Sequence, residues 1–331
     1  MKKGIRLLLS FLMLLSVGLL IDGIGGSDLR AQEKTFLIKI GHDSPTTSHI
    51  HEFCVKFKEV AEAETKGQVK VEIYPAAQLG SEGKMFEQVQ LGAIQMALGS
   101  SGMVAIEPKL GVFELPYLFR SREHMIKVMD GPIGDELAGL VLPKGIRNLV
   151  YADHGFRVIT NNVRPIVKPE DLKGLKIRTP PNKLRIRIFN AYGAAATPLP
   201  FPELFMAMQT GVVDGQENPL PYAYDMSFYE VQKYCSLSNH VYSPLYVLIN
   251  ENFYQSLPKN LRDAVVKAGH AARDYERDYV LQRNKTAVAQ LQGKGMKVNE
   301  VDTNAFIKAS KVIWDEESKN YGKLIERIAN Y

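Results

Sequence analysis

The stretch PLPFPELFMAMQTGVVDGQENP, Pro198–Pro219, combines several local structure signals in one short segment. Its alternating prolines fix φ and favour an extended entry. Glu203–Thr210 follows with the apolar spacing of a short helix, and Gly211 is placed to end that helix. The next two residues, Val212–Val213, are expected to form a very short strand.

Polar side chains come directly after this expected strand. Asp214–Gly215 is a turn signal, and Gln216, Glu217 and Asn218 follow it. Ligands of open α/β sheets bind at strand ends, so these side chains are candidates for a binding site. The alternative is that they only satisfy the backbone of a turn.

Strand and helix patterns alternate along the rest of the chain. The β-α-β-α-β order of the first third favours a mostly parallel sheet with helices on its faces. The pattern leaves open which strands share a sheet. The expected strands are 36–41, 69–74, 96–98, 157–160, 175–178 and 245–249, and the expected helices are 51–65, 84–91, 183–192 and 257–291.

The N-terminal segment has the pattern of a secretory signal peptide. Three cationic residues precede the apolar run Leu7–Ile21, which is too short to span a bilayer comfortably. Cleavage is expected near Ala31, and an uncleaved anchor is the alternative. No cysteine near this junction supports a lipid anchor, and no later segment is long and apolar enough to cross a membrane.

About 300 residues follow the expected cleavage position, which suggests two lobes of ordinary domain size. Removing residues 1–31 takes away four positive and two negative charges, so the formal net charge falls from +5 to +3. This mild charge gives no reason to expect a nucleic acid partner. Cys54 and Cys235 are expected to be buried free thiols, and a disulfide between them is the alternative for an exported protein.

Several further segments carry a family resemblance. Together with DGQENP they resemble, in order and over almost the whole mature chain, the substrate-binding proteins of TRAP transporters, the DctP-type family of periplasmic solute receptors. These segments are YPAAQLG (74–80), LPYLF (115–119), DLKGLKIR (171–178), FYEV (228–231) and NHVY (239–242).

The resemblance implies an α/β, two-lobed periplasmic-binding-protein (Venus-flytrap) fold with crossovers and a long helix spanning both lobes. Residues 1–31 would be the signal peptide. Lobe I would comprise residues 32–154 plus 244–283, and lobe II residues 155–243 plus 284–331. The ligand would lie in the cleft and be enclosed when the lobes close about a hinge.

The resemblance also implies a carboxylate site. Arg178 matches the arginine that binds the ligand carboxylate, for which a planar, always-charged fork is well suited. Arg157 matches a second arginine, and Asn218 an asparagine that contacts the same carboxylate. Phe201 matches an aromatic position that packs on the ligand's carbon skeleton, with a core role as the alternative.

From the first lobe, the resemblance implies Asp43, Glu82 and Ser100 as further ligand-binding residues, although each could instead cap a helix. Receptors with acidic residues here often take polyhydroxylated acids. Ser100 stands where some relatives carry a carboxylate, which argues against a sugar acid. A C4-dicarboxylate, a monocarboxylate such as a 2-hydroxy or 2-oxo acid, and an aromatic acid all stay open.

The implied function is that of a periplasmic receptor without catalysis or cofactor, which delivers an organic acid to the small and large membrane subunits of a TRAP transporter. No metal is expected, because Glu217–Asn218 stands where metal-using relatives carry a Glu-Trp pair. The receptor would be a monomer or a homodimer. Trp314 and Tyr321 would lie either on a dimer face or in the core.

Three other functions are less consistent with the sequence than the receptor. A hydrolase lacks support, because Gly99–Gly102 is shorter than a G-x-S-x-G elbow. A metal-binding receptor would use His42, His49, His51 and Cys54, but their spacing does not fit a helical ligand pair. A receptor for an amino acid or sugar of the ATP-driven transporter class is the nearest rival, and the DGQENP motif argues against it.

Overall fold

The computed structural model describes residues 34–331. The expected signal peptide and its cleavage near Ala31 lie outside the described residues. Within residues 34–331, none of the helices combines the length and the apolar character needed to cross a bilayer.

Ten strands of the described chain form one continuous mixed sheet. The central path runs β2-β1-β3-β9-β4-β7-β5-β6, and β8 joins β4 to β10. The strands are β1 (Phe36–Gly41), β2 (Val69–Tyr74), β3 (Met96–Gly99), β4 (Ile146–Asn161), β5 (Lys176–Thr179), β6 (Ala195–Pro198), β7 (Gly215–Pro219), β8 (Tyr234–Leu237), β9 (Tyr242–Asn250) and β10 (Lys297–Glu300).

Strand β4 belongs to two groups of strands. Its residues up to Phe156 pair with β9 and so join β1, β2 and β3, which we call the first strand group. From Arg157 onward β4 pairs with β7 and β8, which with β5, β6 and β10 make the second strand group. The predicted parallel pairing is confirmed for β2, β1 and β3 in the first third, whereas β9 and β4 add antiparallel pairings that were not predicted.

The five predicted helices are present as α1, α2, α6, α7 and α10, with small shifts at their ends, whereas seven further helices of the described chain were not predicted. Ser48 accepts a hydrogen bond from the His51 amide and caps α1, so this helix begins two residues before the predicted start. The helices are α1 (His49–Glu64), α2 (Glu82–Leu91), α3 (Met103–Ile106), α4 (Arg122–Met129), α5 (Pro132–Gly139), α6 (Lys183–Ala191), α7 (Leu204–Gln209), α8 (Leu220–Asp225), α9 (Glu251–Ser256), α10 (Lys259–Gly293), α11 (Thr303–Tyr321) and α12 (Lys323–Ala329).

The DGQENP region differs from its prediction in one respect that matters for the site. Val212–Val213 is not a strand, and the strand is Gly215–Pro219 itself, β7. Val212 is 54% exposed, so it does not lie on the apolar side of the preceding helix. Gln216, Glu217 and Asn218 are thus buried members of a strand rather than residues that follow one.

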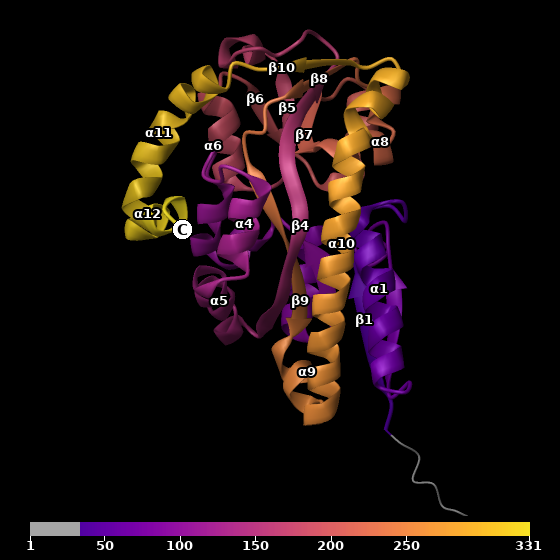
Figure 1. Ribbon diagram of the computed structural model, residues 1–331. Coiled ribbons are helices and arrows are strands. Elements are labelled where there is room, and N and C mark those ends of the chain that lie inside the picture. Colours follow the sequence, from indigo (N-terminus) through magenta and orange to yellow (C-terminus); the bar gives the residue numbers. More distant parts are fainter. Residues whose placement is uncertain (1–33) are drawn as a thin grey trace, which may run out of the picture. The chain divides into compact units, whose positions relative to one another are not determined.

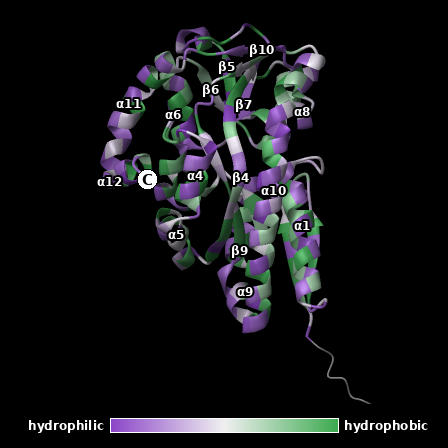
Figure 2. Cartoon of the chain, in the orientation of Figure 1, coloured by the Kyte–Doolittle hydropathy of each residue, from purple (hydrophilic) through white to green (hydrophobic). Residues whose placement is uncertain are grey.

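Helix α10 runs beside β4 along both strand groups (Figure 1). It carries both hydrophobic and hydrophilic residues along its length (Figure 2), and its buried residues include Val265, Ala268 and Ala272. Cys54, in α1, and Cys235, in β8, are buried in separate hydrophobic clusters, and both are free, as predicted.

The C-terminal helices pack against distant parts of the chain. The Trp314 indole N–H donates to the Pro116 carbonyl at 3.1 Å, and the Tyr321 hydroxyl donates to the Pro108 carbonyl at 3.3 Å. Both aromatic side chains are partly buried against a hydrophobic core, so the core alternative describes their environment in this chain.

Candidate functional site

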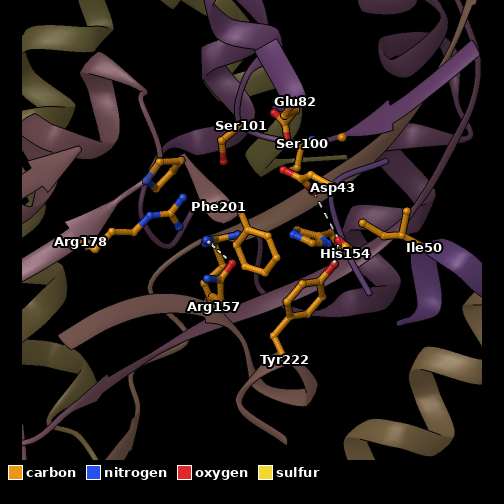
Figure 3. A pocket seen from close by; sticks show the side chains of 14 residues that line it. Asp43, Ile50, Glu82, Ser100, Ser101, His154, Arg157, Arg178, Phe201 and Tyr222 are labelled. Atoms are coloured by element: carbon orange, nitrogen blue, oxygen red, sulfur yellow. Dashed lines mark hydrogen bonds between the residues drawn. The ribbon is translucent and has the colours of Figure 1, made fainter. Parts of the chain in front are cut away.

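One cavity brings together all seven predicted site residues, although they come from segments far apart in the sequence (Figure 3). Both strand groups contribute to its wall. The lining residues are Asp43, Ser44, Ile50, Glu82, Gly99, Ser100, Ser101, His154, Arg157, Arg178, Pro180, Phe201, Asn218 and Tyr222.

Of the two arginines that line this cavity, Arg178, in β5, is the one without a carboxylate partner in the described chain. Its Nε and Nη2 atoms donate to the Leu199 carbonyl at 2.9 and 2.6 Å, and that neutral acceptor leaves its charge unpaired. Nη1 makes no hydrogen bond to residues 34–331. Burial lowers the pKa of Arg178 to about 10, so the guanidinium stays charged at neutral pH. Nη1 and the second hydrogen of Nη2 can together hold a carboxylate end-on.

Arg157, in contrast, is paired inside the protein. Its Nε and Nη2 atoms donate to the Glu217 carboxylate at 2.5 and 3.1 Å. Arg185 also donates to Glu217 at 2.5 Å, and its other end pairs with Glu114. Burial by itself would raise the pKa of Glu217, but Arg157 and Arg185 hold it well below its ordinary value. The network fixes Arg157 and leaves its Nη1 as the remaining donor.

Asn218 is held in one orientation by its neighbours. Its Oδ1 accepts from Arg157 Nη2 at 2.9 Å, and its Nδ2 donates to Gln216 Oε1 at 2.6 Å. One hydrogen of the amide nitrogen is left over. The amide can therefore offer a donor to an anionic oxygen in the cavity that Arg178 also lines.

The opposite wall of the cavity is acidic. Glu82, the first residue of α2, accepts from the Ser100 and Gly102 amides at 3.1 and 2.5 Å. Burial, and then the nearby Asp43, raise the pKa of Glu82 to about 7. Burial also raises the pKa of Asp43 to about 6, although Arg178 opposes that shift. The cavity thus has a cationic wall and an acidic wall.

Ser100 and Phe201 complete the predicted set. Ser100 does not cap a helix, because its Oγ is buried and has no hydrogen-bond partner among residues 34–331. Phe201 lies beneath the Arg178 guanidinium, with 5.9 Å from Cζ to the ring centroid, and 5.6 Å from the Tyr222 ring. Phe201 also packs against two hydrophobic clusters, so it serves the core and the cavity wall at once.

Sequence reasoning missed several residues of the cavity wall. Among them are Ser44, His154 and Tyr222, whose polar side chains could contact a ligand. Tyr222 Oη lies 2.9 Å from Ser44 Oγ, which joins the two strand groups across the cavity. His154 lies three residues before Arg157 in β4, and the chain kinks between them at Gly155, where φ is +108°. This kink breaks strand alternation, so spacing from Arg157 could not place His154.

The histidines named for the alternative of a metal-binding receptor lie next to other histidines. His42 Nε2 lies 3.1 Å from His51 Nδ1, and His49 Nε2 lies 3.3 Å from His154 Nδ1. Cys54, on the buried face of α1, belongs to a hydrophobic cluster. Residues 34–331 contain no group of three or more His, Cys, Asp or Glu side chains arranged to hold a metal ion.

Two groups of strands linked by β4, with a polar cavity between them, define a two-lobed periplasmic solute-binding protein. The profile of the DctP family, described as bacterial extracellular solute-binding protein, family 7, matches residues 40–320, and the chain belongs to this family. It is thus a TRAP-type solute-binding protein, in a family of extracytoplasmic receptors rather than enzymes.

Three proteins similar to this chain bind different carboxylates. The chain is 35% identical over 302 residues to the C4-dicarboxylate-binding periplasmic protein DctP of Rhodobacter capsulatus, covering 90% of this chain and 89% of that one. A TRAP solute-binding protein from Polaromonas sp. JS666, bound to D-erythronate, has a TM-score of 0.87 at 35% identity and covers 89% and 98% of the two chains. The sugar acid-binding protein DctPAm of Advenella mimigardefordensis, in complex with galactonate, has a TM-score of 0.87 at 31% identity and covers 90% of this chain and 97% of that one.

Proposed function

We propose that the protein captures a small hydroxylated monocarboxylate. Arg178, Asn218 and Arg157 would bind the carboxylate, while Asp43, Glu82 and Ser100 would bind hydroxyl groups at the far end and Phe201 would pack on the carbon skeleton. The protein would act as a receptor without chemistry, and the ligand would leave as it entered.

The opposed charges of the two cavity walls carry this proposal. At neutral pH Asp43, with a pKa of about 6, is mostly ionised and Glu82, with a pKa of about 7, is partly ionised. A second carboxylate on the ligand would therefore be repelled, which disfavours a C4-dicarboxylate. Hydroxyl groups donate hydrogen bonds to such carboxyls. Ser100 by itself argued against a sugar acid, but Glu82 and Asp43 supply the acceptors that such an acid needs. D-erythronate and galactonate, held by two similar proteins, are hydroxylated monocarboxylates.

Capture would proceed by closure of two lobes, residues 32–154 with 244–283 and residues 155–243 with 284–331. The change in β4 pairing at Arg157 and the positive φ of Gly155 support a hinge at this boundary. The signal peptide would be cleaved near Ala31, which would release the receptor into the periplasm. The closed, loaded form would then be recognised by the small and large membrane subunits of a TRAP transporter.

A thermal-shift screen of residues 32–331 tests the proposal. The panel should hold hydroxylated monocarboxylates, C4-dicarboxylates, 2-oxo acids, aromatic acids, amino acids and neutral sugars. A ligand at a hundredfold excess over its Kd stabilises the native state by about 2.7 kcal/mol. A rise in Tm with hydroxylated monocarboxylates alone supports the proposal, and a rise only with another class refutes it.

A further inference from the structure

His154 is a buried cavity residue with one ring nitrogen free to act on a ligand. The residue is 7% exposed, and its ring packs edge-on against Tyr222 with 5.2 Å between centroids. Nδ1 lies 3.3 Å from His49 Nε2, whereas Nε2 has no hydrogen-bond partner among the described residues. His154 lies in the cavity between the acidic wall and Tyr222 (Figure 3).

His49 and Glu276 hold this imidazole from behind. His49 is the buried first residue of α1, and its Nε2 lies 3.8 Å from Glu276 Oε1 of α10. Glu276 Oε2 accepts from the Asp153 amide at 3.0 Å, so the carboxyl group has a fixed orientation. Its Oε1 is buried without a hydrogen-bond partner among residues 34–331.

This geometry selects the tautomer of both histidines. Burial raises the pKa of Glu276 well above its ordinary value. With the carboxyl proton on Oε2, Oε1 is an acceptor, and a lone pair on His49 Nε2 at 3.8 Å would leave both atoms without a hydrogen. With the hydrogen on His49 Nε2, that N–H donates to His154 Nδ1 and also faces the otherwise unpaired oxygen. Burial lowers the pKa of His49 to about 3 and holds that of His154 well below its ordinary value, so both rings are neutral. A neutral His154 that accepts at Nδ1 carries its hydrogen on Nε2.

We propose that His154 is a ligand-binding residue whose Nε2–H donates to a hydroxyl oxygen of the bound acid, and that His49 is the positioning residue that fixes this tautomer. The proposal rests on the proposed function and narrows the class of ligand. A hydroxyl group can accept from His154 while donating to Asp43 or Glu82. A keto oxygen can only accept, and a hydrogen can do neither, so the site would select a hydroxy acid over the matching oxo or deoxy acid.

The decisive test compares two proteins and four ligands by calorimetry. The ligands are D-erythronate and its three monodeoxy analogues, 3,4-, 2,4- and 2,3-dihydroxybutanoate, and the proteins are wild type and His154→Phe, which keeps a ring beside Tyr222. Wild type should lose about tenfold in affinity for one analogue, as expected for an unmatched buried donor. His154→Phe should show a clearly smaller preference for D-erythronate over that analogue, because only the hydrogen bond to Asp43 or Glu82 remains. A variant that keeps the full wild-type preference overturns the proposal.

Two more measurements keep the proposal falsifiable if His154→Phe does not fold. Nitrogen-15 NMR of histidine-labelled wild type should find His154 neutral with the hydrogen on Nε2, and an Nδ1–H tautomer refutes the proposal. His49→Gln keeps a side-chain N–H donor and should retain the hydroxyl preference, whereas His49→Phe should weaken it. His270→Gln, at an exposed histidine of α10, is the matched control and should behave as wild type.

The two proposals fail in different ways. If no hydroxylated acid stabilises wild type, the proposed ligand class is wrong. If D-erythronate binds with the expected stabilisation but its affinity is indifferent to every hydroxyl group, or equally sensitive in His154→Phe, the receptor function stands and the role of His154 is refuted.

Discussion

At the scale of the residue, the site depends on which buried charges are already neutralised. Arg157 and Arg178 are both buried arginines in the same cavity, but Arg157 spends its charge on Glu217 while Arg178 donates to a neutral carbonyl. An anionic ligand gains most from the unpaired cation, because a paired one offers little net field. This difference makes Arg178 the primary carboxylate anchor in the proposed site.

Replacing Arg178 should abolish ligand capture. Arg178→Ala removes the unpaired cation, and the loss of a buried hydrogen-bonded charge partner costs about 2–5 kcal/mol of binding free energy. Ligand-induced stabilisation in thermal shift should therefore disappear at ligand concentrations that saturate wild type, while the circular dichroism spectrum stays native. Arg327→Ala, at an exposed arginine of α12, is the control and should bind normally. Unchanged affinity in Arg178→Ala would remove this residue from the site.

The two acidic residues of the cavity should make stability depend on pH. Burial raises the pKa of Glu82 to about 7 and that of Asp43 to about 6 in the folded protein, above their ordinary values. The fold therefore favours the neutral carboxyls, and this contribution is present at low pH and is lost as pH rises through 6 and 7.

Denaturant unfolding at pH 5 and pH 8 measures this effect. The stability of ligand-free wild type relative to Glu82→Gln should fall between these values by on the order of 2 kcal/mol. The same comparison with Glu87→Gln, an exposed glutamate of α2, should show no change with pH. A wild-type advantage that grew with pH would mean that Glu82 is stabilised as an anion, contrary to this account.

At the scale of the element, strand β7 organises the buried charges. Its central Glu217 faces β4, and it is contacted by Arg157, by Arg185 from α6 and by His240 Nε2 at 3.3 Å. One buried carboxylate thus ties β7 to its neighbour strand, to a helix and to the segment before β9. A strand with this sequence is stable only where cations surround it, because a buried unpaired charge is very costly.

Removing the charge of Glu217 should destabilise the whole domain. Glu217→Gln leaves Arg157 and Arg185 without their anionic partner, and breaking a buried ion pair costs about 3–5 kcal/mol. Urea unfolding monitored by circular dichroism should give an unfolding free energy that is lower by that amount. Glu316→Gln breaks an exposed pair with Arg187 and should change the unfolding free energy by no more than about 1 kcal/mol. Equal effects of the two substitutions would contradict the role given to the buried network.

At the scale of the whole molecule, side chains from the two strand groups meet directly across the cavity. Tyr222 Oη lies 2.9 Å from Ser44 Oγ, and Asn182 Nδ2 donates to the Ser101 carbonyl at 3.1 Å. These hydrogen bonds need no ligand. They would therefore stabilise a closed arrangement before capture and raise its population in the ligand-free protein.

Tyr222→Phe should shift the ligand-free protein toward the open arrangement while keeping the aromatic ring. Small-angle X-ray scattering should give a larger radius of gyration for the ligand-free variant than for ligand-free wild type, and equal values at ligand saturation. The apparent Kd should rise by the factor by which the closed population falls. Tyr275→Phe, at an exposed tyrosine of α10, is the control. Identical scattering of the two ligand-free proteins would mean that this contact does not set the closure equilibrium.

The sequence by itself determined six of the ten strands and five of the twelve α-helices of the described chain, since apolar periodicity and caps are local properties. The helix that Gly92 ends and the strand at 69–74 are examples. Val212–Val213 was mistaken for a strand because two β-branched residues suggest one, whereas the real strand, GQENP, is polar and buried. No local propensity favours burying Glu217. Its buried carboxylate is stabilised by Arg157 and Arg185, which are distant in sequence.

For the candidate site, too, the sequence determined one part and the tertiary structure decided another. Motif resemblance alone led to Arg178, Asn218 and the other five predicted residues, and the tertiary structure gathered all seven around one cavity. Only the tertiary structure decided which arginine keeps its charge free, and only the kink at Gly155 brought His154 into the wall against His49. Hydrogen-bond partners and electrostatic environment depend on distances in space, and a chain read in one dimension does not contain them.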